Sequence, residues 1–322
     1  NCLTGDHEVR TTTGWKRLDE LDGTERILQW HSDTGIAEYT DYEPFSTIYN
    51  GTIYEYDTNY HKAIYTADHR VYFNTPKNLE WRVDTAENIS KRQPNGIYLP
   101  VGFVVGGNNS LFNSNEIMLL EAIRADGYIY KGRAYFHFSK QRKIDRLKYI
   151  CSLLGLTINI YQDKGTEKDT FSICVSGEII ERINDTLGKP KKLGDWVLTL
   201  PTDVRVVWLN ELQHWDGYSP SKHRISVSTA VKNHAYWLCE MALFTGWQGQ
   251  VKYDYPNNRG WSKPDGALHY VTVRNKQRVK FVERPKSYQH RGIVYCVSVP
   301  SKAFVVRRKG KVWITGHCPF DA

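Results

Sequence analysis

A diverged duplication in the middle of the chain restricts the possible folds most. Two apolar segments, 119–125 and 209–215, each run into an Asp-Gly-Tyr triplet, and the two aspartates, Asp126 and Asp216, lie ninety positions apart. After each aspartate the pattern predicts a strand pair, an apolar helix and two more strands, so each copy predicts an αββαββ unit. One Asp-Gly after a helix is usually a C-cap. Two in equivalent positions indicate a shared role.

The segments on either side of the duplication are predicted to be all-β. Residues 2–105 and 286–317 contain short runs of β-branched and aromatic residues, separated by Gly, Asp and Asn, which is typical of strands and turns. The duplicated segment is predicted at 106–285, with repeats at about 112–195 and 200–285. Because 322 residues exceed what one core usually supports, we predict a multidomain chain in which an α+β domain interrupts an all-β domain.

Composition restricts the kinds of binding partner and the cellular location that we predict for the protein. The net charge of +8 favours a polyanionic partner such as nucleic acid. No run of eighteen apolar residues and no secretory leader is visible, so neither membrane insertion nor export is predicted. The cysteines are scattered, without the paired spacing of a zinc site or the density of a disulfide scaffold, which favours a reducing, cytoplasmic location. Cys151 and Cys239 lie in apolar helical patterns and are predicted core residues.

Cysteines near both ends of the chain suggest chemistry that joins the ends. Cys2-Leu3-Thr4-Gly5-Asp6 opens the chain, and Thr66-Ala67-Asp68-His69 precedes an apolar strand. The closing stretches 294–297, 304–306 and 316–318 complete a set that resembles, in the right order, the splicing motifs of an intein. The resemblance implies a horseshoe-shaped, all-β splicing (Hint) domain that brings the chain ends together. By the same resemblance, Asn1 is an upstream flanking residue, and residues 318–322 begin the downstream flank.

The resemblance also assigns roles. Cys2 would attack the carbonyl of Asn1 and form a thioester, with His69 as the acid toward the amide nitrogen and Thr66 hydrogen-bonded nearby. Cys318 would then accept the acyl group. Both steps use host flanks in cis and need no cofactor.

Two positions near the closing motif leave questions open. Cys296 stands where the family has an Asp or Cys that assists the downstream nucleophile, and a buried structural thiol is the alternative. The family ends in His-Asn, whose asparagine amide releases the branched intermediate. Here Gly316 and His317 precede Cys318. An imidazole cannot form a succinimide, so we predict that this chain starts the reaction but stalls at the C-terminal junction.

The duplicated segment resembles the paired motifs of a LAGLIDADG homing endonuclease, which commonly lies nested inside inteins. The resemblance makes Asp126 and Asp216 the metal-binding carboxylates. A carboxylate at a helix C-terminus opposes the helix dipole, which a cation relieves, and two such groups suit Mg²⁺ and phosphodiester hydrolysis. Lys192 would lie near the scissile phosphate, or it is a solvated surface lysine. Trp215 replaces the small residue expected in the second motif and should loosen the helix pairing.

Strand alternation suggests a DNA-binding face. Between Tyr128 and Lys140 the odd positions are mostly polar, whereas Tyr130, Ala134, Phe136 and Phe138 are predicted to face the core. Such ribbons fit the major groove, although an ordinary solvent face is the alternative. The predicted partner is double-stranded DNA with a long asymmetric site, bound by a monomer. The predicted DNA contacts are Lys131, Arg133, Tyr135, His137, Arg224, Ser226, Gln250 and Lys252.

Two other functions remain open at the level of sequence. The chain could be a degenerate protein that only binds DNA. It could instead be a hedgehog-type autoprocessing domain that cleaves only at Cys2, although such a domain does not need a downstream nucleophile such as Cys318.

Overall fold

The chain folds into two compact units. The computed structural model describes residues 2–59, 61–163, 170–254 and 268–317. The first unit is discontinuous and contains residues 1–106 and 276–322, and the second contains residues 107–275. No helix in the described ranges is long and apolar enough to cross a membrane.

The first unit is built of antiparallel sheets, so the strand-rich prediction for the flanking segments is confirmed. One sheet has the order β2-β1-β20-β3-β4, with β21 also paired to β20, and the other sheets are β18-β9-β7-β8 and β19-β5-β6. Its helical elements are α1 (Ala86–Lys91) and the 3₁₀ turns η1 (Leu18–Glu20) and η2 (Pro94–Gly96). Its strands are β1 (Glu8–Thr11), β2 (Gly14–Arg17), β3 (Ile27–Trp30), β4 (Ala37–Thr40), β5 (Glu43–Asp57), β6 (Lys62–Thr66), β7 (Arg70–Thr75), β8 (Asn78–Thr85), β9 (Tyr98–Pro100), β18 (Arg278–Lys280), β19 (Lys286–Ser298), β20 (Ala303–Arg308) and β21 (Lys311–Gly316).

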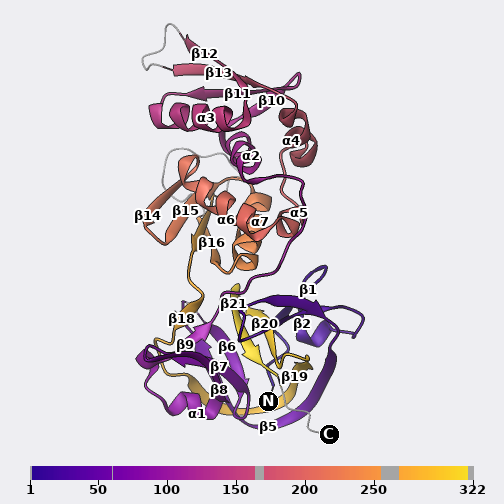
Figure 1. Ribbon diagram of the computed structural model, residues 1–322. Helices are drawn as coiled ribbons and strands as arrows, with labels where there is room; N and C mark the ends of the chain where they lie inside the picture. Colours follow the sequence, from indigo (N-terminus) through magenta and orange to yellow (C-terminus); the bar gives the residue numbers. More distant parts are fainter. Residues whose placement is uncertain (1, 60, 164–169, 255–267, 318–322) are drawn as a thin grey trace. The chain divides into compact units, whose positions relative to one another are not determined.

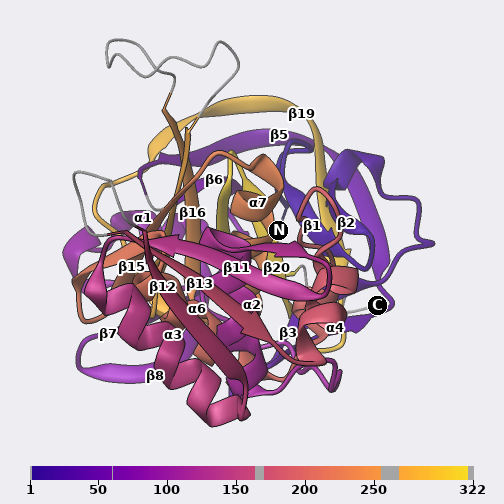
Figure 2. The same cartoon turned by 90° about the horizontal axis from the view of Figure 1, so that it is seen from above.

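A long two-stranded ribbon joins the two sequence segments of this unit. β5 and β19 pair without interruption from Glu55 opposite Lys286 to Glu43 opposite Ser298, and they curve side by side around the unit (Figures 1 and 2). The N-terminal segment enters the same layer, because Leu3 bridges both Tyr295 of β19 and Tyr65 of β6. The pairing therefore places residue 2 at a sheet that both segments build.

The core of the first unit is aromatic and β-branched. Trp313, Tyr65 and Phe304 are completely buried in one cluster with residues from the other sheets. Burial of such large side chains supplies much of the stability of a β unit. The cluster lies directly beneath the Thr66–His69 turn, because Tyr65 precedes it in the chain and stacks on His69 with ring centroids 4.8 Å apart.

The second unit contains two sheets of the same design. Their orders are β10-β11-β13-β12 and β14-β15-β17-β16, which is the same path through four strands. The strands are β10 (Tyr128–Tyr130), β11 (Arg133–Phe138), β12 (Thr157–Asp163), β13 (Thr170–Ser176), β14 (Gly217–Ser221), β15 (Arg224–Thr229), β16 (Gln248–Asp254) and β17 (Leu268–Arg274). The helices are α2 (Ser114–Asp126), α3 (Gln141–Leu154), α4 (Ile179–Leu187), α5 (Trp196–Thr199), α6 (Thr202–Glu211) and α7 (Lys232–Phe244), with the 3₁₀ turn η3 (Leu212–His214).

The two copies differ at the helix that leads to the aspartate. α2 begins with a capping box in which Asn113 and Glu116 satisfy each other's backbone, and it continues to Asp126. Its counterpart α6 ends at Glu211 and continues only as a 3₁₀ turn. Trp215 leaves the helical region at φ −111° and ψ −100°, so bulk at this position coincides with an early end of the helix.

The structure corrects one prediction about strand faces. Tyr130 was predicted to face the core, but it is 55% exposed. The reason is a two-residue turn at Lys131 and Gly132, which have φ values of 48° and 70°. This turn pairs Tyr130 with Arg133, so the inward and outward positions change parity between β10 and β11, and Ile129 turns inward instead.

The end of the inserted segment also differs from the prediction. It was predicted at residue 285, whereas the division of the chain falls at Asn275. β18 is the reason, because it pairs with β9 of the first unit, with Val279 opposite Leu99.

Candidate functional site

In the first unit the amide of Cys2 is held by the Thr66–His69 turn. The Cys2 N–H donates to the Thr66 hydroxyl over 2.8 Å, and the Thr66 N–H donates to the Cys2 carbonyl over 3.1 Å. The Thr66 hydroxyl in turn donates to the Asp68 carboxylate at 2.9 Å. Because the Thr66 hydroxyl donates its hydrogen to the carboxylate, the Thr66 oxygen can accept a hydrogen bond from the Cys2 amide. Cys2 and Thr66 are both buried.

His69 lies in the same turn and reaches the last described strand. Its Nε2 is 2.6 Å from the Thr315 hydroxyl of β21, and its backbone N–H donates to the Thr66 carbonyl. Both side chains are completely buried. The turn therefore contacts Cys2 through Thr66 and Thr315 of β21 through His69, although Cys2 and Thr315 are separated by most of the sequence.

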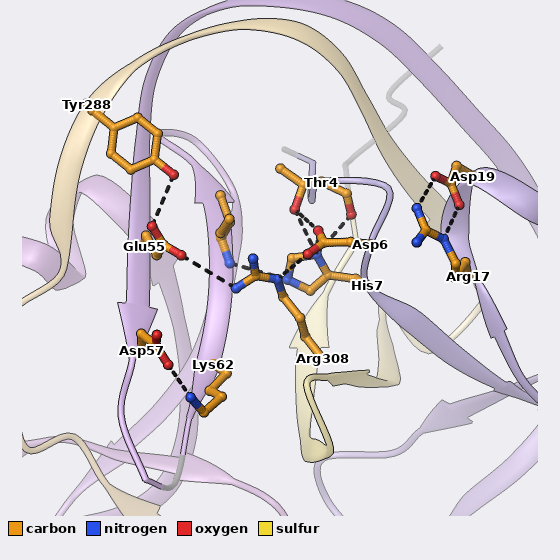
Figure 3. A network of polar contacts seen from close by, with 11 residues as sticks. Thr4, Asp6, His7, Arg17, Asp19, Glu55, Asp57, Lys62, Tyr288 and Arg308 are labelled. Atoms are coloured by element: carbon orange, nitrogen blue, oxygen red, sulfur yellow. Dashed lines mark hydrogen bonds and ion pairs between the residues drawn. The ribbon is translucent and has the colours of Figure 1, made fainter.

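A charged network fixes the segment that follows Cys2 (Figure 3). Arg308 of β20 donates to Asp6 over 2.7 Å and forms an ion pair with Glu55 of β5 at 3.7 Å. Glu55 also accepts from the hydroxyl of Tyr288. Burial alone would raise the pKa of Asp6, but hydrogen bonds from Thr4 and Arg308 outweigh it and lower that pKa. The network holds the opening motif against three strands, β5, β19 and β20.

His7 is a buried neutral histidine that the sequence prediction did not include. Its Nε2 accepts from the Ile64 N–H at 3.2 Å, and its Nδ1 lies 2.9 Å from the Thr4 carbonyl, which can only accept. The ring is therefore the Nδ1–H tautomer. Burial lowers the pKa of His7 to about 4, so it remains neutral near pH 7. Through these two hydrogen bonds His7 links the opening turn to β6.

The other predicted splicing residues lie as follows. Cys296 packs with Cys2 and Val294 in a small buried cluster, so it is close to the proposed nucleophile. His317 is buried and its N–H donates to the Lys302 carbonyl at 3.1 Å. Asn1 and Cys318 lie outside the described residues.

In the second unit Asp126 and Asp216 influence each other. The pKa of Asp216 is raised to about 6, first by burial and then by the negative charge of Asp126, while Arg124 and Lys143 oppose the shift. By its surface area Asp216 is nevertheless an exposed residue, so the effect of burial on its pKa is moderated by solvent. The Asp126 side chain is 22% exposed and pairs with Lys143. The two carboxylates are thus close enough for mutual repulsion, which a shared cation would relieve.

Lys191, the neighbour of the predicted Lys192, interacts electrostatically with both carboxylates. Its Nζ donates to the carbonyls of Ile123, Arg124 and Gly127 at 2.7–2.8 Å and so caps the C-terminal end of α2. Burial and the Arg124 charge lower the pKa of Lys191, while Asp216 and Asp126 act against that shift. Lys192 is exposed to solvent.

Two glutamates at equivalent positions of the copies support the helix pair. Glu121 forms two hydrogen bonds of 2.7 Å with Arg124 and accepts from Trp208 of α6 at 2.8 Å. Glu211 pairs with Arg146 of α3 and accepts from Trp215 at 2.9 Å. Because both carboxylates are almost completely buried, each depends on its arginine.

The donor set fits a hard divalent cation only in part. Two carboxylates supply oxygen ligands of the kind that Mg²⁺ prefers. No group of three His, Cys, Asp or Glu side chains suited to a metal occurs in the described ranges. Asp126 and Asp216 would therefore hold Mg²⁺ together with ligands such as water or phosphate oxygens.

All of the predicted DNA contacts except Ser226 are exposed or half-buried. On β11, Arg133 and His137 are exposed and Tyr135 is half-buried, and Tyr128 stacks on Tyr135 with centroids 5.3 Å apart. Lys131 lies in the turn at the end of this face. The face is therefore more aromatic than basic.

The second face is more polar. Arg224 and Gln250 are half-buried and Lys252 is exposed, whereas Ser226 is only 6% exposed. The register adds β17 to this face, because Arg274 lies opposite Arg224.

Sequence reasoning missed several of these residues. The duplication could have identified Glu121 and Glu211, which stand five positions before each aspartate. The Lys191-Lys192 pair could not be resolved without the loop geometry. Nothing in the sequence pointed to Thr315.

Comparison with curated proteins gives matches to enzymes of different kinds. The chain is 24% identical over 369 residues to a ribonucleoside-diphosphate reductase subunit beta of Aquifex aeolicus, covering 98% of this chain and 50% of that protein. It is 21% identical over 410 residues to a DNA-directed RNA polymerase subunit beta C-terminal section of Stigeoclonium helveticum, covering 98% of this chain and 36% of that protein. The chain thus spans half or less of the relatives that it matches. No protein-family profile matches it.

Solved structures give weak similarity. A class 3 split intein, AceL NrdHF in a splice-inactive variant, is 11% identical with a TM-score of 0.35, and 98% of each chain is covered. The homing endonuclease I-DmoI in complex with its target DNA in the presence of Mg is 12% identical with a TM-score of 0.36, covering 51% of this chain and 91% of that one. The N-terminal LAGLIDADG domain of DUF199/WhiA is 13% identical with a TM-score of 0.33, covering 51% and 78%. The structural neighbours thus include an intein and LAGLIDADG proteins, all at low similarity.

Proposed function

We propose that the chain is a self-splicing intein that carries a site-specific homing endonuclease. In this proposal the first unit performs acyl rearrangement and the second cuts double-stranded DNA. The observation that carries it is the hydrogen bonding of the Cys2 amide to Thr66, in the same turn that presents His69. The nitrogen is that of the thiol-bearing residue itself, and the turn that binds it also carries a buried histidine, which is an arrangement that suits an N-to-S acyl shift.

The identity of the relatives supports the intein hypothesis. A reductase subunit and a polymerase subunit share no activity, yet each matches nearly the whole of this chain with only part of its own length. A segment shared by unrelated enzymes is expected when one element has inserted into different host genes.

The proposed first step uses Cys2, Thr66 and His69. The Cys2 thiolate attacks the carbonyl of Asn1, the C–N bond breaks, and His69 delivers a proton to the nitrogen that Thr66 holds. Sulfur is a suitable nucleophile because a thiol is partly ionised near neutral pH. Placing it beside the carbonyl supplies an effective concentration of about 10⁵ M or more. Cys318 would then take the acyl group from Cys2.

The C-terminal junction is the point at which we propose that the reaction stalls. Residue 317 is histidine, which has no side-chain amide to attack its own carbonyl. Gly316 also leaves no space for a penultimate histidine, because a Cβ there would lie 2.8 Å from the Arg70 Cβ and 2.9 Å from its carbonyl oxygen. The single substitution His317→Asn would therefore restore the missing side-chain amide without adding a side chain at residue 316.

The acyl shift is tested with the chain extended upstream of Asn1. A strong thiol nucleophile should release the upstream segment, and Cys2→Ala should abolish the release. Cys151→Ala, which removes a buried thiol of the other unit, is the matched control and should leave the release unchanged. The proposal is wrong if the upstream segment stays attached while Cys2 is intact and the chain is folded. With both flanks extended, His317→Asn should yield a ligated product detectable by mass.

For the second unit we propose Mg²⁺-dependent hydrolysis of DNA, with Asp126 and Asp216 as the metal ligands. Mg²⁺ would supply an activated water and stabilise the leaving oxygen. Mutual repulsion of the two carboxylates supports this role. Lys191 adds positive charge beside them, and Lys192 remains the alternative first predicted from the sequence. The sheet faces would position the duplex through the contacts predicted above.

The endonuclease is tested on the host gene without the segment that encodes residues 2–317. Cutting should require Mg²⁺ and should vanish in Asp126→Ala, whereas Asp145→Ala, at an exposed carboxylate of α3, should cut normally. Tight binding without cutting in the unaltered chain would favour the degenerate DNA-binding alternative.

A further inference from the structure

A hydroxyl of the last described strand is placed against the imidazole of His69. Thr315 Oγ1 lies 2.6 Å from His69 Nε2 and 3.4 Å from the carbonyl oxygen of Arg70. Thr315 and His69 are both completely buried. A contact this short between two buried side chains leaves little freedom for either to reorient.

The partners of the hydroxyl determine which nitrogen of His69 carries the proton. A hydroxyl has one proton to donate and two lone pairs to accept with. The Arg70 carbonyl can only accept, and the Tyr65 oxygen is a further partner of Thr315, so both offer the Thr315 proton an acceptor other than His69. The Thr315 oxygen then accepts from His69, which requires the proton on Nε2 and leaves Nδ1 for proton exchange.

Neighbouring rings hold the imidazole in this orientation. Tyr65 stacks on His69 at an interplanar angle of 16°. The Tyr65 hydroxyl is in turn tied to His61 Nε2 at 2.8 Å, and it also hydrogen-bonds Thr315, while burial raises the pKa of Tyr65 well above its usual value. Tyr65 therefore stays a neutral phenol that packs against both partners.

We propose that Thr315 is a positioning residue that holds His69 in the Nε2–H tautomer, so that Nδ1 exchanges protons with the amide at Cys2. The inference rests on the proposed acyl shift and adds a residue to it. It also links the two ends of the reaction, because Thr315 lies two positions before His317 in the strand that leads to the downstream junction.

The test compares three substitutions in the full chain. Thr315→Val keeps the shape of the side chain and removes the hydroxyl, whereas Thr315→Ser keeps the hydroxyl. Thr245→Val is the matched control, because Thr245 is a buried threonine of the other unit whose hydroxyl donates to a helix carbonyl. Each chain is labelled with ¹⁵N-histidine for NMR, and His69 signals are assigned by their loss in His69→Gln.

The expected results separate a positioning role from packing. In the unaltered chain His69 should show the Nε2–H tautomer. In Thr315→Val the buried N–H loses its acceptor, so the population should move toward Nδ1–H and thiol-induced release should slow about tenfold. Thr315→Ser should keep the original tautomer and most of the rate, and Thr245→Val should change neither. If Thr315→Val does not fold, Thr315→Ala removes the same hydroxyl without added bulk.

Three results would overturn the proposal. They are an Nδ1–H tautomer in the unaltered chain, an unchanged tautomer in Thr315→Val, and equal slowing of release in Thr315→Ser and Thr315→Val. The NMR readout does not depend on cleavage. Absence of thiol-induced release with a tautomer shift in Thr315→Val would therefore refute the proposed splicing and leave the positioning role standing.

Discussion

The two units hold their candidate reactive groups by opposite electrostatic means. In the first unit, the Cys2 amide donates to the neutral Thr66 hydroxyl, which in turn donates to Asp68. The histidines His7 and His61 of this unit are buried and uncharged near pH 7, because burial lowers their pKa values to about 4 and about 3. In the second unit, Asp126 and Asp216 are surrounded by the cations of Arg124, Lys143 and Lys191.

The difference follows from what each site would have to do. Moving a proton within a buried peptide needs uncharged donors and acceptors in fixed geometry. A site that binds a metal ion beside a phosphate needs charged side chains. The charges of its carboxylates and cations must balance one another before the metal and the phosphate bind.

The largest effect is expected on the rate of thiol-induced release, when the proposed proton donor His69 is replaced. His69→Gln should slow thiol-induced release by about 10²–10⁴-fold, because an amide cannot transfer the proton. His234→Gln, at a buried histidine of the second unit, should release at the normal rate. A His69→Gln chain that releases normally would remove His69 from the mechanism. Mass spectrometry of the released segment provides the measurement.

Removal of a buried charge should be the next largest effect. Glu121→Gln leaves Arg124 buried without its carboxylate and should lower the free energy of unfolding of the second unit by about 3–5 kcal/mol. Asp19→Asn breaks the exposed pair with Arg17 in the first unit, and it should change stability very little. Denaturant unfolding of both variants makes the comparison, and equal losses would contradict it.

Acid should affect the two units with opposite sign. The folded pKa of His7 is lowered from about 6.5 to about 4, so its contribution is complete above pH 6.5 and is lost as the pH falls toward 4. The loss is about 3 kcal/mol. The raised pKa of Asp216 acts in reverse, and protonating it below about pH 6 should stabilise the second unit. Hydrogen exchange of β6 and α7 amides, followed from pH 7 to pH 4, reports the two units separately.

Two adjacent lysines should behave differently. Lys191→Met removes three charge-assisted bonds to the end of α2 and should destabilise the second unit by about 2 kcal/mol. Lys192→Met should have no measurable effect on unfolding, since its side chain is exposed. A larger loss in Lys192→Met would reverse the assignment. Chemical denaturation followed by circular dichroism is sufficient.

The smallest effect is expected at the carboxylate pair. Burial is the first cause of the raised Asp216 pKa, and Asp126 is the second. Asp126→Asn should therefore lower the Asp216 pKa only partway toward its usual value, by an amount worth about 1 kcal/mol after solvent screening. A ¹³C carboxyl titration by NMR measures it, and an unchanged pKa would show that the two groups do not interact.

Local sequence patterns predicted the secondary structure well, but strand pairing decided which side chains face the core. The β-branched and aromatic runs identified the strands of the first unit, because strand preference is carried by short segments. The face occupied by Tyr130 was assigned wrongly, because parity across a hairpin depends on the turn and not on the strand sequence. The position of β18 was likewise hidden, since its partner β9 lies far away in the chain.

The strand-rich flanks, the duplicated middle and the types of side chain available for chemistry could be predicted from the sequence alone. Composition, periodicity and spacing act over a few residues, and they are sufficient for these features. Which groups meet became visible in the fold: Thr66 contacts the Cys2 amide, His69 contacts Thr315, and Lys191 contacts the end of α2. These contacts join residues up to 246 positions apart. Side-chain packing and strand register bring these residues together, and neither can be predicted from a short segment of the sequence.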